Sequence, residues 1–519
     1  MKIVLYQPQQ TNKLKYGQSN LDLLPQELMH VASLPRQAGH EVVLIDGSLY
    51  DQDEAHRKVL DACEGASIFA STGILGFMVS DAYTCAEKVR AKHPRTKRFV
   101  GGWFASVMPE LYLRDGVFDA VAKGQGELTF MDLVDAVQSG ADFDGIAGLA
   151  LWRDGAVHDT EHRSVVGFDK LPEPSWDLID ITPYKEGQLS ANAPNHHVRM
   201  PAPPWIGRRK PYFGISYFSS FGCPEPCSFC CSPEVTFRRW KAKSASKVLD
   251  DLEMLQDRWG KFDVVRFLDA NFGVLQKRTK EFAEGLLERD MRIGWNAFIE
   301  TYSVCHYEES VLDACAASGY YVAEVGAETG HPDTMKRVGK PIKNDENFEA
   351  AARLYDRGIF ASITYIIGFP NEPEESMIAT LDQARRVQLR CKDSSTHVLP
   401  FRPIPGTSMY REAVDLGFTP PADIHTWGDI GEYHTHQTWN VIPERVMRMR
   451  KLHNHYTTLY KGIARERYGL FEKLAGWRLK NDNFKVPVDA PLFQAFNTLE
   501  NKIRGKRAHK KDLVDQALG

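Results

Sequence analysis

Several features that would place the chain in a specialised class are missing from its sequence. Among 519 residues, 64 Lys and Arg nearly balance 68 Asp and Glu, which gives a net charge of −4, so charge offers no reason to expect nucleic acid as a partner. No apolar run reaches the roughly 18 residues of a membrane-spanning helix, so we expect no transmembrane segment. Nine cysteines are too few for a disulfide scaffold in a chain of this length. We therefore expect a cytoplasmic globular protein of several domains.

One local excess of charge lies near the C-terminus, where six cations follow each other closely: Lys502, Arg504, Lys506, Arg507, Lys510 and Lys511. A solvated tail is the simpler interpretation of such a run. Peripheral contact with an acidic membrane surface is the alternative.

The first part of the chain alternates short apolar runs with helical patterns. Five runs are expected to be strands: Ile3–Tyr6, Val42–Ile45, Ser67–Ala70, Arg98–Val100 and Phe118–Val121. This alternation predicts an α/β domain over residues 1–145 with a doubly wound, flavodoxin-like, five-stranded parallel sheet. Ligands of such sheets bind at the carboxyl ends of the strands. Prolines punctuate residues 146–210, which we interpret as a short strand region followed by a linker.

The alternation resumes at Tyr212. Six further strands are expected: Phe213–Tyr217, Val264–Leu268, Gly294–Ile299, Tyr320–Val325, Ala361–Ile366 and Thr396–Pro400. Six strand–helix units predict a partial (β/α)6 barrel over residues 211–410, with its active site at the carboxyl ends of the strands. Beyond residue 410 the strand signal fades, and we expect a small helical C-terminal domain over residues 411–519.

Three cysteines, Cys223, Cys227 and Cys230, lie within eight residues in the loop after the first barrel strand. Thiolates at these separations can converge on one soft metal site. Structural zinc is an alternative, but zinc needs four ligands, usually two close pairs, and no second pair follows. A chance grouping of buried cysteines is the remaining alternative.

The Cys-x3-Cys-x2-Cys spacing, with Phe229 directly before the last cysteine, resembles the radical S-adenosylmethionine (SAM) superfamily. The resemblance implies that Cys223, Cys227 and Cys230 hold a [4Fe–4S] cluster whose open iron binds SAM. It also implies that the backbone at Phe229 approaches the adenine, and that an external donor such as flavodoxin or ferredoxin reduces the cluster. We expect Cys231 to be a buried thiol and not a ligand.

Acidic residues at the ends of later barrel strands match positions where this superfamily holds SAM. By that resemblance Glu300 and Glu328 contact the ribose or amino group, and Asp269 lies at the same rim, nearer the substrate. Capping or ion pairing at the barrel rim is the simpler alternative for these carboxylates.

The loops of the N-terminal domain resemble the cobalamin-binding domain of cobalamin-dependent radical SAM enzymes. The resemblance assigns eleven residues to the cofactor: Gln7, Pro8, Ser71, Thr72, Gly101, Gly102, Trp103, Gly124, Gln125, Gly126 and Glu127. A degenerate domain that serves only as a scaffold is the alternative. The loop from Pro8 to Gly17 contains no histidine, so we expect cobalamin without a histidine on its lower face.

The resemblance implies a C-methyltransferase that methylates an unactivated carbon through a 5′-deoxyadenosyl radical and methylcobalamin. An oxidative cyclase or ring-rearranging enzyme with the same cofactors, of the tetrapyrrole cyclase type, stays open. A methylthiotransferase would need a second three-cysteine cluster upstream, where only Cys63 and Cys85 occur. A cobalamin sensor without catalysis would need no cysteine loop. The substrate, a small molecule or a peptide, is not indicated.

Overall fold

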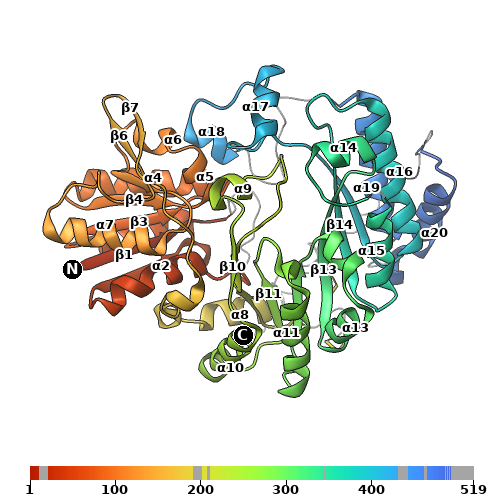
Figure 1. Ribbon diagram of the computed structural model, residues 1–519, viewed down its shortest axis with the longest axis horizontal. Helices are drawn as coiled ribbons and strands as arrows, with labels where there is room; N and C mark the ends of the chain where they lie inside the picture. Colours follow the sequence, from red (N-terminus) through yellow and green to blue (C-terminus); the bar gives the residue numbers. More distant parts are fainter. Residues whose placement is uncertain are drawn as a thin grey trace, which may run out of the picture.

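A computed structural model describes residues 1–10, 21–190, 201–206, 211–343, 345–429, 442–460 and 465–484, together with 487, 489, 491 and 492. The basic run at 502–511 and most of the histidine-free loop, from residue 11 onward, lie outside the described residues. Figure 1 shows two α/β units side by side, with the last helices on the outer side of the second unit.

The first unit contains the predicted flavodoxin-like sheet. Its five parallel strands run in the order β2-β1-β3-β4-β5, which is the flavodoxin order; they are β1 (Lys2–Gln7), β2 (Glu41–Asp46), β3 (Ile68–Thr72), β4 (Lys97–Gly101) and β5 (Ala120–Ala122). Successive residues of β1 point to opposite faces, so Ile3 and Leu5 enter one core, and Val4 and Tyr6 enter the other.

Two more strands extend this sheet beyond the predicted boundary at residue 145. β6 (Leu149–Arg153) pairs antiparallel with β5, and β7 (Ala156–Asp159) pairs antiparallel with β6. Asp154 and Gly155 both have positive φ angles, 52° and 80°, as a tight hairpin turn requires. The region assigned to a linker, 146–210, therefore begins with a hairpin of the first domain.

Six helices cover the two faces of this sheet: α2 (Gln26–Gln37), α3 (Gln52–Ala62), α4 (Phe77–Lys92), α5 (Trp103–Val107), α6 (Glu110–Leu113) and α7 (Glu127–Ser139). Helix α5 begins at the carboxyl end of β4, and α7 begins just after β5. The helix starts and the loops before them therefore gather at the edge where ligands of this fold bind.

The second unit is the predicted partial barrel. Its six strands are all parallel, in the order β15-β14-β13-β12-β11-β8; they are β8 (Gly214–Tyr217), β11 (Val264–Phe267), β12 (Gly294–Phe298), β13 (Tyr320–Glu328), β14 (Phe360–Ile367) and β15 (Ser395–Pro400). Five long helices alternate with them: α10 (Ala245–Trp259), α11 (Gln276–Glu288), α13 (Glu309–Ala317), α15 (Glu346–Tyr355) and α16 (Glu374–Arg390).

Side-chain amides cap both open edges of the barrel sheet. At the β8 edge, Gln188 of α8 (Thr182–Leu189) bonds Gly214 N and O at 2.8 and 3.0 Å, and Gln26 Oε1 accepts from Phe218 N at 3.0 Å. At the β15 edge, Asn454 of α19 (Glu444–Tyr460) bonds Val398 N and O at 3.0 and 2.8 Å. These bonds satisfy backbone groups that an unclosed sheet leaves unpaired.

The helices after the barrel do not all form one separate domain, as had been predicted for residues 411–519. Helix α18 (Ile424–Asp429) packs on α4, and its Ile424 and Trp427 enter a core of the first unit. By contrast, α19 packs on α16 and β15, and α20 (Arg465–Lys480) packs on α19. Trp427 is almost fully buried there, so α18 is anchored to the first unit by a large apolar side chain.

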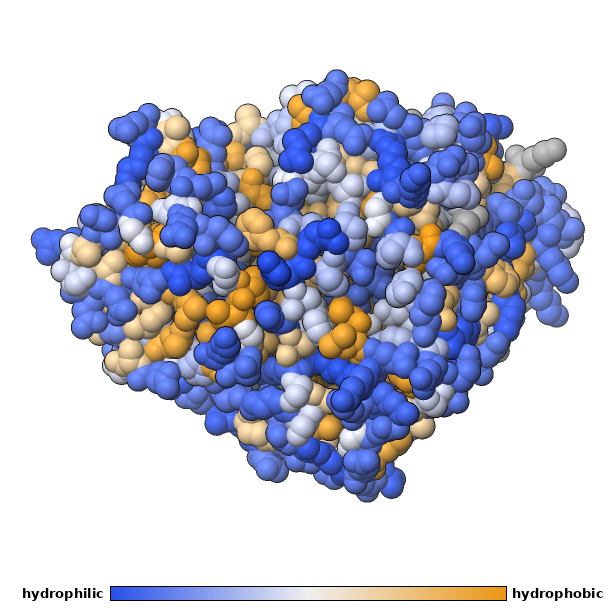
Figure 2. Space-filling view, in the orientation of Figure 1, coloured by the Kyte–Doolittle hydropathy of each residue, from blue (hydrophilic) through white to orange (hydrophobic). Residues whose placement is uncertain are grey.

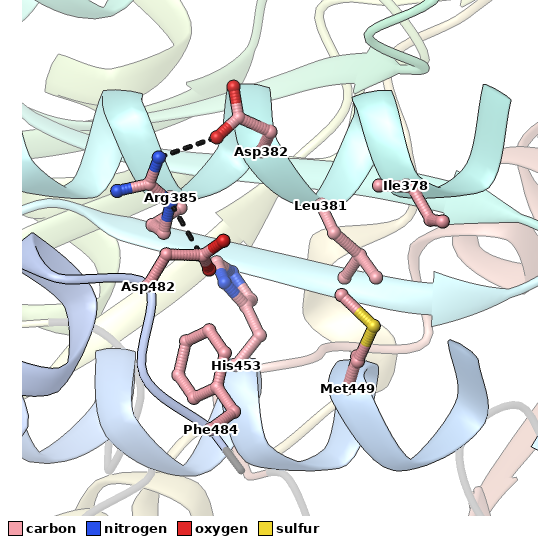
Figure 3. A pocket seen from close by; sticks show the side chains of 8 residues that line it. All are labelled: Ile378, Leu381, Asp382, Arg385, Met449, His453, Asp482 and Phe484. Atoms are coloured by element: carbon pink, nitrogen blue, oxygen red, sulfur yellow. Dashed lines mark hydrogen bonds and ion pairs between the residues drawn. The ribbon is translucent and has the colours of Figure 1, made fainter. Parts of the chain in front are cut away.

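A small recess lies between α16 and α19, on the outside of the barrel sheet (Figure 3). Arg385 pairs with Asp382 on the same helix at 2.5 Å and with Asp482 across the recess at 3.7 Å. Burial lowers the pKa of the adjacent His453 to about 3. The recess has room for little more than water, about 30 Å3. No helix in the described ranges combines the length and hydropathy that crossing a bilayer requires.

Candidate active site

The cysteine loop follows the first barrel strand and is held on two sides. The short strand β9 (Ser220–Gly222) leads directly into Cys223. Ser228 N donates to Val338 O at 3.1 Å, and Ser228 O accepts from Met409 N at 3.3 Å. The loop is thus fixed between the segment after α14 (Pro332–Arg337) and the start of α17 (Ser408–Asp415).

The three predicted thiols lie in each other's electrostatic range. Burial raises the pKa of Cys223 to about 12 and raises that of Cys227, and a charge on Cys230 adds to both shifts. A hydrogen bond from the Cys231 thiol lowers the pKa of Cys230 to about 7, and Ser232 N donates to Cys230 Sγ at 3.4 Å. Cys231 therefore lies beside the three predicted ligands and donates a hydrogen bond to one of them, Cys230.

The donor set fits a cluster better than a single ion. Within the described ranges, no three His, Cys, Asp or Glu side chains converge closely enough to hold one metal ion. A four-iron cluster places each cysteine on a different iron, so its ligand sulfurs lie farther apart than those around one ion. Cys223, Cys227 and Cys230 are free thiols, as three ligands of such a cluster would be before it binds.

Glu300 and Glu328 are brought together by a buried lysine. Glu300 follows β12, Glu328 ends β13, and Lys340 Nζ lies 2.5 Å from Glu300 Oε2 and 3.3 Å from Glu328 Oε1. Burial disfavours the ammonium, but the charges of Glu328 and Glu300 outweigh burial and raise the pKa of Lys340. Burial raises the pKa of Glu328, and the positive charge of Lys340 offsets part of that shift. This triad adjoins the cysteine loop, because a Lys340 charge also lowers the pKa of Cys227.

Two features of the triad were not predicted. Nothing in the sequence separates Lys340 from the other cations, because only the turn after α14 brings it back over the strand ends. Glu328 has a φ angle of +59°, in the left-handed region, where the register of β13 against β14 also shifts. Outside turns such as the one at Asp154, this strained conformation clusters at functional positions.

Phe229 and Asp269 occupy different environments. The half-buried Phe229 ring lies 5.9 Å from that of Phe369, after β14. Asp269 is fully buried and accepts from Ser219 N at 2.7 Å, from Ser220 N at 3.1 Å and from the Ser219 hydroxyl. Its oxygens bond the chain before the cysteine loop, which indicates that Asp269 positions that loop; the predicted ligand contact stays a prediction.

In the first unit, the predicted loops after β3, β4 and β5 meet at one edge. Gly73 N donates to Gly101 O at 2.9 Å, and Gly124 N donates to Ser106 Oγ at 3.1 Å. Gly102 has a φ of +93°, and a Cβ there would lie 2.5 Å from Gly73 O. Only glycine permits this approach of the two loops. Thr72 and Trp103 flank the same contact.

The side chains predicted to hold cobalamin divide into two groups. Those of Ser71 and Gln125 serve the fold, because Ser71 Oγ donates to Tyr6 O at 2.9 Å and Gln125 bonds both polar backbone atoms of Val166. Gln7 is buried beside Pro8, and its Oε1 has no hydrogen-bond partner in the described part of the chain. Glu127 is buried after Gly126, and burial raises its pKa to about 7. A buried amide oxygen without a partner and a glycine-lined approach fit a large polar cofactor.

The two candidate sites face each other. Helix α5, after Gly102, packs on α9 (Ser232–Thr236), which directly follows the cysteine loop. A Cβ on Gly124 would lie 3.2 Å from Val235 O. Figure 1 shows α9 between the two units, with α17 and α18 above it.

Comparisons with known proteins agree with this geometry. The B12 binding domain family matches residues 16–134, and the radical SAM superfamily matches residues 217–384. An uncharacterized methyltransferase of Pyrococcus horikoshii is 28% identical over 75% of this chain and 78% of its own. The anaerobic magnesium-protoporphyrin IX monomethyl ester cyclase of Rubrivivax gelatinosus is 26% identical over 56% of this chain and 49% of its own.

The fold has a solved counterpart. The radical SAM methyltransferase TsrM from Kitasatospora setae, with cobalamin and a [4Fe–4S] cluster bound, superposes with a TM-score of 0.61 at 17% identity, over 81% of this chain and 76% of that one. The two family matches confirm the predicted order of domains, a B12-binding domain followed by a radical SAM barrel. The chain therefore combines a B12 binding domain with a radical SAM superfamily domain.

Proposed function

We propose that this enzyme is a C-methyltransferase acting on an unactivated carbon. One observation carries the proposal: the loops of the B12-binding domain lie against α9, the helix that directly follows the cysteine loop. This contact would place cobalamin held by the first unit next to the cluster site of the second, where the two cofactors could act on one substrate. The methyltransferase names among the relatives support this assignment.

The cysteine loop and the acid–lysine triad would divide the work of binding SAM. Cys223, Cys227 and Cys230 would hold the cluster. A bound cluster supplies the electron that cleaves SAM, and bound cobalamin supplies the methyl group. The amino acid end of SAM is a zwitterion, so Lys340 would pair with its carboxylate and Glu328 would accept from its ammonium. Because Lys340 stays charged when buried, the triad is oriented before SAM arrives.

The first unit would hold cobalamin through its backbone and a few buried groups. Gly102 keeps the loops after β3 and β4 in close contact at the edge that would bind the cofactor, and the Gln7 amide oxygen would accept a hydrogen bond from it. Trp427 of α18 packs on Phe104 with 5.4 Å between ring centroids, which closes this end against water.

Location and partners are part of the same proposal. All nine cysteines are free thiols, which supports a reducing, cytoplasmic compartment. Peripheral contact of the basic run at 502–511 with an acidic membrane remains a prediction, as does a small-molecule or peptide substrate.

Product analysis tests the proposal. The full chain is reconstituted with iron, sulfide and cobalamin, then given SAM labelled in its methyl group and candidate substrates. We expect labelled product and 5′-deoxyadenosine from the wild type, and neither from Cys227→Ala, whose iron content should fall. 5′-Deoxyadenosine without label in any product would contradict methyl transfer and favour the cyclase alternative.

A further inference from the structure

An exposed basic segment, residues 237–241, follows α9 on the outer side of the cysteine loop. Its side chains Phe237, Arg238, Arg239 and Lys241 are exposed. Figure 2 shows strongly hydrophilic side chains gathered at the centre of this face, over α9 and the chain after it. None of these residues belongs to either candidate site.

The basic segment is tied directly to the cysteine loop. β10 (Trp240–Ala242) pairs antiparallel with β9, so Trp240 lies opposite Gly222, one residue before Cys223. Arg238 Nε donates to Pro224 O, inside the cysteine loop, at 3.1 Å. The segment therefore forms the outer wall of the cluster site, and only a few residues separate it from the thiols.

The backbone of the segment is strained and exposes an aromatic ring. Phe237 and Arg238 have consecutive φ angles of 53° and 56°. Non-glycine residues rarely adopt these angles, and such strain clusters at functional positions. It holds the Phe237 ring against His162, with centroids 3.8 Å apart, while 54% of Phe237 stays exposed. An exposed aromatic among cations is typical of an interaction surface.

Cations outnumber acids around this wall. Elements packed on the cysteine loop add the exposed Lys336 and Arg411, and an Arg337–Glu412 pair at 2.5 Å. The acids nearby are Glu225, Glu234, Asp333, Glu412 and Asp415, the last residue of α17. Neither Arg239 nor Lys241 forms an ion pair with any residue that the structure describes. The surface thus carries a positive surplus on a chain whose net charge is −4.

We propose that the basic segment is the docking surface for a small acidic electron-donor protein of the flavodoxin or ferredoxin class. The inference rests on the proposed function, because it supplies the electron that opens SAM. One electron passes from the donor to the cluster, the donor is oxidised, and no covalent bond forms or breaks. Charge complementarity selects an acidic partner, and the segment's contact with the loop keeps the transfer path short.

Charge reversal at Arg239 and Lys241 tests the docking surface. The full chain carrying Arg239→Glu and Lys241→Glu is reconstituted, and reduction of its cluster is followed anaerobically by stopped-flow absorbance. The reductants are reduced flavodoxin and, separately, photoreduced deazaflavin. Lys261→Glu with Arg292→Glu is the matched control, since both residues are exposed and precede the amino ends of β11 and β12, away from the cluster.

We expect the second-order rate with flavodoxin to fall about tenfold or more at low salt in the first variant only. The deficit should shrink as salt rises, and reduction by deazaflavin should be unchanged. Phe237→Ser should weaken flavodoxin binding without that salt dependence. If flavodoxin reduced the clusters of both charge variants at the same second-order rate, the basic segment would not be the docking surface. A cluster that deazaflavin reduces without any cleavage of SAM would contradict the proposed function instead.

Discussion

Replacing Lys340 by methionine removes the only cation from a buried triad. The Lys340 side chain is 3% exposed and lies within 3.3 Å of both Glu300 and Glu328. Its loss leaves two carboxylates facing each other without compensation. Removing one partner of a buried ion pair costs roughly 3–5 kcal/mol, and we expect Lys340→Met to lower the free energy of unfolding by about this amount at pH 8.

The cost should depend on pH in a defined direction. Burial already raises the pKa of Glu328, and losing Lys340 raises it further. A carboxyl whose folded pKa lies above its unfolded value destabilises the fold as pH rises through that interval. The Lys340→Met penalty should therefore shrink as pH falls from 8 to 5, because lower pH favours the uncharged form of Glu328.

Urea unfolding of the apoprotein, followed by circular dichroism at both pH values, measures the penalty. The double variant Lys340→Met with Glu328→Gln removes one of the stranded charges and should recover part of the loss. Lys277→Met is the exposed control. A penalty below about 1 kcal/mol at pH 8, or no recovery in the double variant, would refute the assignment of the triad as a coupled buried cluster.

Three further outcomes follow. Gly102→Ala should abolish cobalamin retention, measured by absorbance after gel filtration, since its Cβ would meet Gly73 O at 2.5 Å; unchanged retention would place the cofactor elsewhere. Asp269→Asn should lower iron incorporation several-fold and leave cobalamin binding intact, because it loosens Ser219 and Ser220 before the cysteine loop; equal loss of both cofactors would indicate global unfolding instead. Asn454→Ala should cost about 1–3 kcal/mol by leaving Val398 N without its acceptor, while Val398 O keeps its bond from Arg450; a neutral result in thermal denaturation would mean that water replaces the amide.

The sequence predicted both sheets because parallel strands are short continuous apolar runs, bounded by helices of clear period. It also predicted the cysteines, whose spacing is local. The meeting of Glu300 with Glu328 followed from the rule that strand ends gather at one rim. The roles of Lys340 and Asp269 and the position of α18 could not be predicted from the sequence, because each depends on a partner far along the chain. Asp269, for example, looks identical in sequence whether it faces a ligand or bonds Ser219.

The amides that cap β8 have a consequence for how the molecule unfolds. Gln26 belongs to the first unit and Gln188 to the chain that connects the two, yet both complete the backbone hydrogen bonding of the second unit. Separating the units would expose a bare strand edge, which is prone to pair with other chains. We therefore expect the two units to melt as one cooperative body, and a chain that starts near residue 211 to aggregate. The distance between the two cofactors would then be set at folding, without a hinge to adjust it.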